Sequence, residues 1–133
     1  MENILKIKET NFTVNRGGWE ECFEGYLIDT DKQTIKLGIS TGQSCCENFG
    51  YFMSEDNVSE FEGSELVSVE ITDTQLKPCS DFDASNMYEG GVMFVNINTS
   101  NGLLQFVAYN EHNGYYGHEA IVMSKQLNLE ETL

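Results

Sequence analysis

The sequence contains few prolines, histidines and arginines, and it has no long uninterrupted run of apolar residues. Among 133 residues there are one proline, two histidines and a single arginine, Arg16. The longest apolar stretches are far shorter than the roughly 20 residues that a membrane-spanning helix requires. The single proline and the absence of low-complexity runs exclude a proline-rich linker. These absences leave an ordinary globular domain as the expected class.

The N-terminal region and the cysteine spacing also lack familiar signals. Met1-Glu2-Asn3 leads into an alternating segment and has neither the basic nor the apolar region of a secretory signal. The four cysteines show no C-x-x-C spacing, and free thiols are the default in a reducing compartment. We therefore expect a cytoplasmic protein.

Positive charge is scarce and unevenly distributed. The net charge is −15, from 22 acidic and 7 basic residues. Residues 1–36 contain seven acids and five bases, whereas residues 37–76 contain eight acids and no base. Such a charge disfavours nucleic-acid binding, which requires cations against the phosphates, and it favours basic partners. Solubility alone is the alternative explanation for the acidity.

The residues that are present favour a packed β domain. Hydrophobic residues make up 40% of the chain and aromatic residues 11%, which is enough for a core. The length suits a single domain, residues 1–133. Apolar and polar residues alternate with a period of two, and helical periodicity is rare. We predict an all-β fold, a mainly antiparallel sandwich or open barrel with about seven strands and at most one or two short helices.

The clearest local signal is Asn101-Gly102, which lies between two β-rich runs in residues 92–112. Asn-Gly predicts a hairpin, because a type I′ turn needs positive φ at both central residues. The other expected strands are residues 4–14, 22–29, 34–40, 49–53, 65–76 and, as the last, 119–124.

Two irregularities are expected along these strands. Residues 54–63 could hold one helical turn, with Ser54 or Asp56 as its N-cap and Gly63 as its stop. In residues 65–76 the apolar positions are only partly in register, which indicates a β-bulge.

The heptapeptide HNGYYGH, residues 112–118, contains both histidines of the chain. If the flanking runs pair, His112 and His118 lie at the two shoulders of one hairpin. Zinc usually needs three or four protein ligands, and alternation places each neighbouring Glu on the opposite face from its histidine. We predict that the histidines hold no metal. Tyr115 and Tyr116 then form either a plain turn or an amphipathic recognition tip.

Two further groups could carry chemistry. Cys45 and Cys46 are adjacent, so on a strand they point to opposite faces and cannot chelate one ion together. No nucleophile signature surrounds them, and buried small cysteines are the favoured interpretation. Arg16 precedes Gly17-Gly18 and Trp19, so a glycine turn there could offer N–H groups to an anion. Pairing of Arg16 with one of the many carboxylates is the alternative.

Two stretches carry a resemblance, "QSCCENFGYFMSEDN" (43–57) and "LQFVAYNEHNGYYGHEAIV" (104–122). Across residues 40–129 the chain resembles a family of small, uncharacterised proteins of bacteriophages and Firmicute prophages, with the CCE and HNGYYGH blocks as its distinctive parts. The resemblance implies a phage anti-defence protein that acts in the host cytoplasm. It supplies no catalytic residues.

Two binding mechanisms suit that context, and the sequence favours the first. An acidic inhibitor would cover the nucleic-acid groove of a basic host defence protein such as a nuclease, as many anti-CRISPR proteins do. The alternative is a sponge for a nucleotide immune signal, of the kind that counters Thoeris or CBASS defence, although one arginine and six lysines make a poor phosphate cradle.

A small hydrolase is the third class, with only Cys46 and the histidines to offer. We expect no enzyme activity, no catalytic residue, no metal and no cofactor. The expected binding residues are Arg16, Trp19, Tyr51, Glu55, Asp56, Glu60, Glu62, His112, Tyr115, Tyr116 and His118.

Overall fold

The computed structural model describes residues 2–15, 17–41, 48–54, 57–72, 91–111, 119–125 and 127–133. They form nine strands and one short 3-10 helix, η1 (Val58–Phe61). The strands are β1 (Glu2–Asn15), β2 (Glu20–Thr30), β3 (Thr34–Ser40), β4 (Asn48–Met53), β5 (Glu65–Thr72), β6 (Gly91–Thr99), β7 (Gly102–Glu111), β8 (Glu119–Met123) and β9 (Asn128–Thr132). No helix in these ranges is long and apolar enough to span a membrane.

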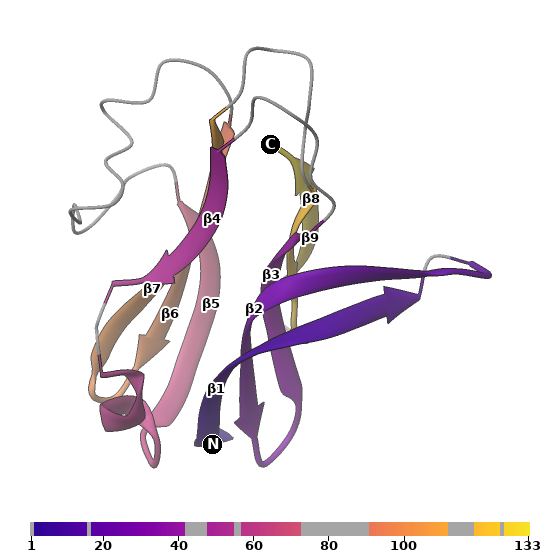
Figure 1. Ribbon diagram of the computed structural model, residues 1–133. Coiled ribbons are helices and arrows are strands. Elements are labelled where there is room, and N and C mark those ends of the chain that lie inside the picture. The colour runs from indigo at the N-terminus through magenta and orange to yellow at the C-terminus, as the bar shows by residue number, and fades with distance from the viewer. Residues whose placement is uncertain are drawn as a thin grey trace.

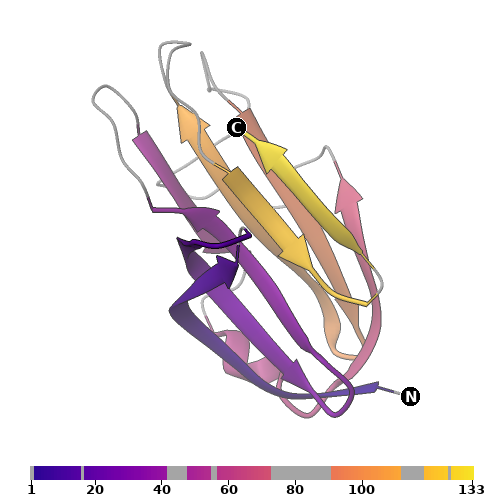
Figure 2. The same cartoon turned by 90° about the vertical axis from the view of Figure 1, so that its right-hand side faces the viewer.

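All nine strands belong to one antiparallel sheet, in the order β4-β7-β6-β5-β1-β2-β3-β8-β9. The sheet bends over into two layers, with β4 to β7 in one layer and β2, β3, β8 and β9 in the other (Figures 1 and 2). The prediction of a nearly all-β, antiparallel fold is confirmed. The predicted count of about seven strands is wrong.

β1 connects the two layers. Glu2 and Asn3 pair with β5, whereas the strand from Ile4 onward pairs with β2. A register shift between Ile4 and Lys6 leaves Leu5 as an extra residue, 60% exposed, so that both Ile4 and Ile7 face the core. A bulge bends and twists its strand, which lets β1 change layers here.

The segment after η1 holds this corner of β1 in place. The Ile4 N–H donates to the Ser64 carbonyl at 2.8 Å, and the Gly63 N–H donates to the Ile4 carbonyl at 2.7 Å. The Ile7 N–H donates to a carboxylate oxygen of Glu62 at 2.9 Å. These bonds satisfy backbone groups that the bulge removes from the ladder, and such groups are costly to bury unpaired.

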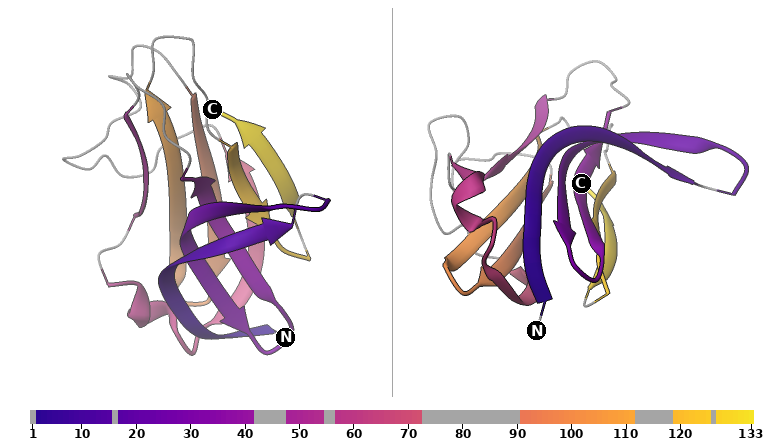
Figure 3. Two further views of the ribbon diagram at one scale, coloured as in Figure 1. Left: turned by 45° about the vertical axis from the view of Figure 1, so that its right-hand side comes forward. Right: turned by 90° about the horizontal axis from the view of Figure 1, so that it is seen from below.

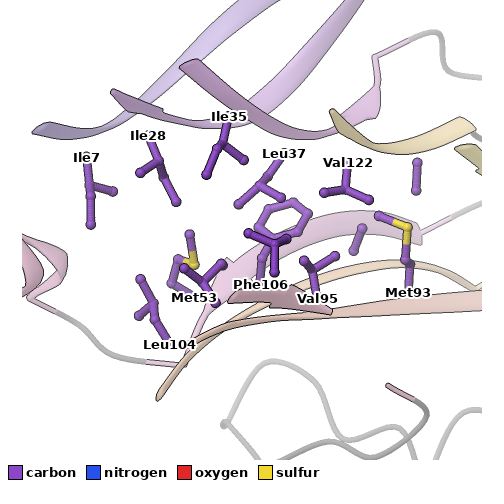
Figure 4. Close-up of a cluster of buried hydrophobic side chains, with 14 of the residues drawn as sticks. Ile7, Ile28, Ile35, Leu37, Met53, Met93, Val95, Leu104, Phe106 and Val122 are labelled. Carbon is purple, nitrogen blue, oxygen red and sulfur yellow. The ribbon is translucent and has the colours of Figure 1, made fainter. Parts of the chain in front are cut away.

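The core lies between the layers. Figure 4 shows Ile28, Ile35 and Leu37 from one layer pointing toward Phe106 and Val95 from the other, and all five are fully buried. They occupy alternate positions of their strands, as period-two patterning requires. Full burial of a side chain of this size contributes about 1.5–3 kcal/mol, so this contact is the main source of stability.

The last strand, β9, was not predicted from the sequence. β8 ends at Met123, and β9 then pairs back antiparallel along it, from Met123↔Asn128 to Glu119↔Thr132. The segment NLEET has one strongly apolar residue, Leu129, which packs against the core, and the next residue on the same face is Glu131. Period-two hydrophobicity is therefore weak over β9.

The predictions for the hairpin, the bulge and the helical turn are confirmed in outline, with differences in detail. The β6–β7 hairpin is confirmed, but its turn lies one residue earlier than predicted: Thr99 pairs with Gly102, and residues 100 and 101 form the loop. A register shift in β5 leaves Val67 65% exposed, which confirms the bulge. The helical turn is η1, preceded by Asn57 rather than by either predicted cap, and Gly63 follows it with φ +86°.

Gly102 offers a test of the hairpin. Its φ is +123°, and no atom lies within 4 Å of the position that a Cβ would occupy, so a substitution would act through backbone strain alone. A β-branched residue strongly resists positive φ, and we expect Gly102→Val to lower the free energy of unfolding by at least about 1 kcal/mol. Denaturant titration measures this loss. An unchanged midpoint would contradict the turn geometry.

Candidate functional site

The distal halves of β1 and β2, residues 11–15 and 20–24, together with residues 17–19, form an extension that we call the arm. The arm projects past the outer face of the layer that contains β3 and β8 (Figures 1 and 3). β1 and β2 remain paired to the end, from Asn11↔Glu24 to Asn15↔Glu20. The arm is thus a continuation of the sheet that bends away from it.

At the base of the arm two glycines face each other, Gly25 in β2 and Gly38 in β3. A Cβ on Gly25 would overlap the Leu37 carbonyl oxygen and lie 2.7 Å from the Gly38 Cα. A Cβ on Gly38 would lie 2.7 Å from the Phe12 ring and 3.0 Å from the Glu24 carbonyl oxygen. Glycine in a strand often marks such a close backbone approach. Two residues without side chains are needed at these positions for the backbones to approach so closely.

An aromatic pair fixes the arm on the outer side of the sheet. Phe12 and Phe23 lie opposite each other across β1 and β2, with ring centroids 5.9 Å apart and planes 12° apart. The Lys36 Nζ lies 6.0 Å from the centroid of the Phe12 ring, within the range of a cation–π contact. Phe23 is fully buried. Packing therefore holds the base of the arm.

The tip of the arm exposes an aromatic side chain. Gly17 and Gly18 have φ of +78° and +120°, and the Asn15 side-chain oxygen accepts the Gly17 N–H at 2.8 Å. Trp19 follows this turn and is 59% exposed. A large amphipathic ring on a projecting hairpin is the type of residue that serves as an anchor in protein interfaces.

The opposite face of the arm is polar and acidic. By strand alternation, Glu9, Asn11 and Thr13 of β1 share a face with Tyr26, Glu24 and Cys22 of β2. Part of this face is a shallow hollow of about 440 Å³, lined by Asn11, Phe12, Thr13, Cys22, Phe23, Glu24 and Thr41. The Glu24 carboxylate and the Thr13 and Thr41 hydroxyls of this hollow can accept hydrogen bonds from cationic side chains.

A tyrosine pair closes the core below this face. The Tyr51 hydroxyl of β4 donates to a Glu9 carboxylate oxygen at 2.6 Å, which joins the two layers. Tyr26 meets Tyr51 edge-on, with centroids 5.8 Å apart, and both rings contact Phe106. Burial and the nearby Glu9 carboxylate raise the pKa of Tyr26 from 10.0 to about 12. The same two causes, with the hydrogen bond to Glu9, raise the pKa of Tyr51 further.

Four of the predicted binding residues, Trp19, Tyr51, Glu60 and Glu62, lie within the described ranges, and they belong to different parts of the molecule. Tyr51 belongs to the aromatic contact with Tyr26 and Phe106, and Trp19 lies at the tip of the arm. Glu60 is exposed on η1, whereas the Glu62 carboxylate has a structural role as the acceptor for Ile7. The remaining predicted residues lie outside the described ranges: Arg16, Glu55, Asp56, His112, Tyr115, Tyr116 and His118.

The metal and thiol predictions stay predictions. Within the described ranges, no three His, Cys, Asp or Glu side chains lie together in a way that could hold a metal ion. Both histidines, and Cys45 and Cys46, lie outside those ranges. Cys22 is a free, exposed cysteine on the arm.

Sequence reasoning missed Glu9, Glu24 and Tyr26, because their role comes from the bend in β2. The available signal was the pair of glycines inside predicted strands, since an isolated strand glycine suggests a bend or a close backbone approach.

The comparisons with known proteins concern the family alone. The family model described as "Domain of unknown function (DUF7448)" matches residues 2–122. The chain belongs to this family. The matched residues include the arm, the glycine pair and most of β8, and they end before β9. Searches of curated proteins and of solved structures found no match.

The tyrosine pair predicts a loss of stability in alkali. In the unfolded chain the tyrosines ionise near 10.0, whereas in the folded chain their pKa values are raised. The stabilisation of the folded state by these two tyrosines is therefore fully present below pH 10, and it is lost as the pH rises through about 12. We expect Tyr51→Phe to reduce the slope of stability against pH above 10, measured by urea titration at each pH. Exposed Trp19→Phe is the matched control. An unchanged slope in Tyr51→Phe would contradict the assignment.

Proposed function

We propose that the protein is a stoichiometric inhibitor that binds a basic, nucleic-acid-binding host defence protein, as a phage anti-defence protein would. The observation that carries the proposal is the absence of described cations from one of the two layers. In the layer of β4 to β7, including η1, the described residues contain no lysine or arginine. Its acids are Glu60, Glu62, Glu65 and Glu70, together with Glu111 at the end of β7.

All the described lysines belong to the other half of the molecule. They lie on β1, on β3 and in two turns, as Lys6, Lys8, Lys32, Lys36 and Lys125. One layer is thus free of described cations in a chain of net charge −15. A nucleic-acid groove is lined by cations that neutralise phosphates, so a surface of carboxylates is complementary to it.

The arm supports a protein partner rather than a small ligand. It presents Trp19 at its tip and Glu20 and Glu24 along its length, and Glu9 lies on the same face next to its base. An exposed tryptophan supplies a rigid anchor, and the carboxylates are acceptors for lysine or arginine. Charge would then set the rate of association, whereas the anchor would set the rate of dissociation.

Nucleotide capture is the second candidate, and one observation favours it. Lys36 and Lys125 line one shallow hollow of about 270 Å³ together with Gln33, Thr34, Met123, Ser124 and Asn128. Two cations there could meet a phosphate. Tyr51 does not support this function, because its hydroxyl already donates to Glu9 and Glu24 lies near it. Carboxylates beside a stacking ring would repel a phosphate.

Removing exposed acids from the cation-free layer tests the proposal. We expect Glu60→Gln with Glu70→Gln to slow association with a partner recovered from defence-active cells, by a factor of a few to about ten at low salt. Dissociation should change less. Each exposed substitution should alter stability by no more than about 0.5 kcal/mol. Stopped-flow kinetics over a series of salt concentrations measures both rates.

The matched control removes two charges from the lysine-bearing half. The control variant combines Asp29→Asn with Asp31→Asn. In the wild type Asp29 accepts a hydrogen bond from the Thr34 hydroxyl and Asp31 accepts one from the Asn3 N–H, and each asparagine keeps an acceptor oxygen for that bond. This control should slow association less. Equal slowing in both variants, or in neither, would contradict the proposal. Native mass spectrometry that finds a bound nucleotide instead of a protein would favour the second candidate.

A further inference from the structure

β9 ends the nine-stranded sheet. β8 pairs with one of its edges, and no described strand pairs with the other. The Ser124 N–H donates to the Leu127 carbonyl, which closes the β8–β9 turn and sets the alternation of the ladder. In that alternation the backbone N–H and C=O groups of Asn128 and Thr132 turn away from β8. Such an edge is a template for another strand.

A recess lies directly beside this edge, between the arm and the outer face of β8 and β9. It measures about 180 Å³ and is lined by Val14, Ile121, Met123, Asn128, Leu129 and Glu130. The apolar residues Val14, Ile121 and Met123 come from the arm and from β8, whereas β9 contributes Leu129 and the polar residues Asn128 and Glu130. An apolar cavity of about 150 Å³ is large enough to hold benzene, so the recess can take one large aliphatic side chain.

We propose that the edge of β9 and this recess together bind an extended segment of the basic partner by strand addition. The backbone of the segment pairs with β9, and one of its apolar side chains enters the recess beside Val14. In strand addition, main-chain bonds supply affinity and pockets for alternate side chains supply specificity. The inference rests on the proposed function, which supplies the positive charge of the partner. What it adds is the way in which the partner binds.

Charge selects a cationic segment over a second copy of this chain. Antiparallel pairing of two β9 strands about a two-fold axis would bring Glu130 and Glu131 of one copy against those of the other. Like charges directly opposite are destabilising, and each copy carries a net charge of −15. Charged residues on a short edge strand are a common protection against self-pairing. The same charges attract lysine or arginine.

The other apolar cluster outside the core offers no comparable surface. Phe94 and Val107 lie on the face of β6 and β7 that points away from the core, together with Phe52, Val92 and Tyr109. Phe94 is only 3% exposed and Val107 is fully buried. The recess beside β9 is the one where an apolar hollow and an open strand edge coincide in the described part of the chain.

The test uses a synthetic seven-residue peptide of alternating lysine and valine, added to the full-length, isotope-labelled protein. We expect NMR shift changes concentrated in the β9 amides and in the methyl groups of Val14 and Ile121. N-methylation of alternate peptide nitrogens removes the donors that would pair with β9, and should weaken binding at least tenfold. Replacing lysine by glutamate in the peptide should abolish binding.

A pair of matched variants tests the recess. Val14→Ser should reduce the affinity for the lysine–valine peptide relative to a lysine–serine peptide, whereas Val67→Ser, at an exposed valine of β5, should not. Equal binding of the N-methylated peptide, or dimerisation through β9 in the absence of peptide, would overturn the inference.

Shift changes confined to residues near Glu60 and Glu70 would overturn strand addition but leave the proposed function intact. Conversely, β9 binding without any salt-dependent association with a basic protein would overturn the proposed function and leave the strand edge as a peptide site.

Discussion

The close contact between the backbones of Gly25 and Gly38 is the constraint on which the outer part of this molecule depends. At this pair β2 approaches β3 so closely that a single added Cβ would overlap a carbonyl oxygen. The far ends of β1 and β2 leave the plane of the sheet and pass over its outer face (Figure 3). Phe12 then comes to rest against Gly38, and Phe23 becomes fully buried beneath it. The arm is held by this packing and by the pairing of Phe23 and Glu24 with β3, and it does not pair with β8 or β9.

This one bend separates the two chemical faces of the arm. The side that turns toward the sheet carries Phe12 and Val14, and it completes an apolar recess over β8 and β9. The side that turns away carries Glu9 and Glu24, and it continues into the hydrogen bond between Tyr51 and Glu9. The proposed partner contacts use both faces: the carboxylates attract a basic surface, and the recess takes one apolar side chain from it. Because both faces depend on the same glycine pair, the arm and its binding properties are coupled to the fold.

The β class of the fold could be predicted from period-two alternation, because each layer has one buried face and one exposed face. The bulge in β5 could be predicted too, since Leu66 and Val69 are out of step. β9 could not, because an edge strand with Leu129 as its main apolar residue carries almost no alternation. The position of the bend was equally hidden: Gly25 and Gly38 lie in different strands, and only the pairing register brings them together. For the same reason the acidic face of Glu9 and Glu24 was not predicted, whereas Trp19 follows an evident glycine turn and was a candidate from the sequence.

Nuclear Overhauser effects between the Phe12 ring protons and the Gly38 α-protons test the role of the glycine pair most directly. In the wild-type protein these effects should be strong, together with effects between the methyl groups of Val14 and Ile121. In Gly25→Ala both sets should be lost, while effects across the core between Phe106 and Leu37 (Figure 4) remain, because the two layers do not depend on the arm. Absence of the Phe12–Gly38 effects in the wild type, or their survival in Gly25→Ala, would contradict the account.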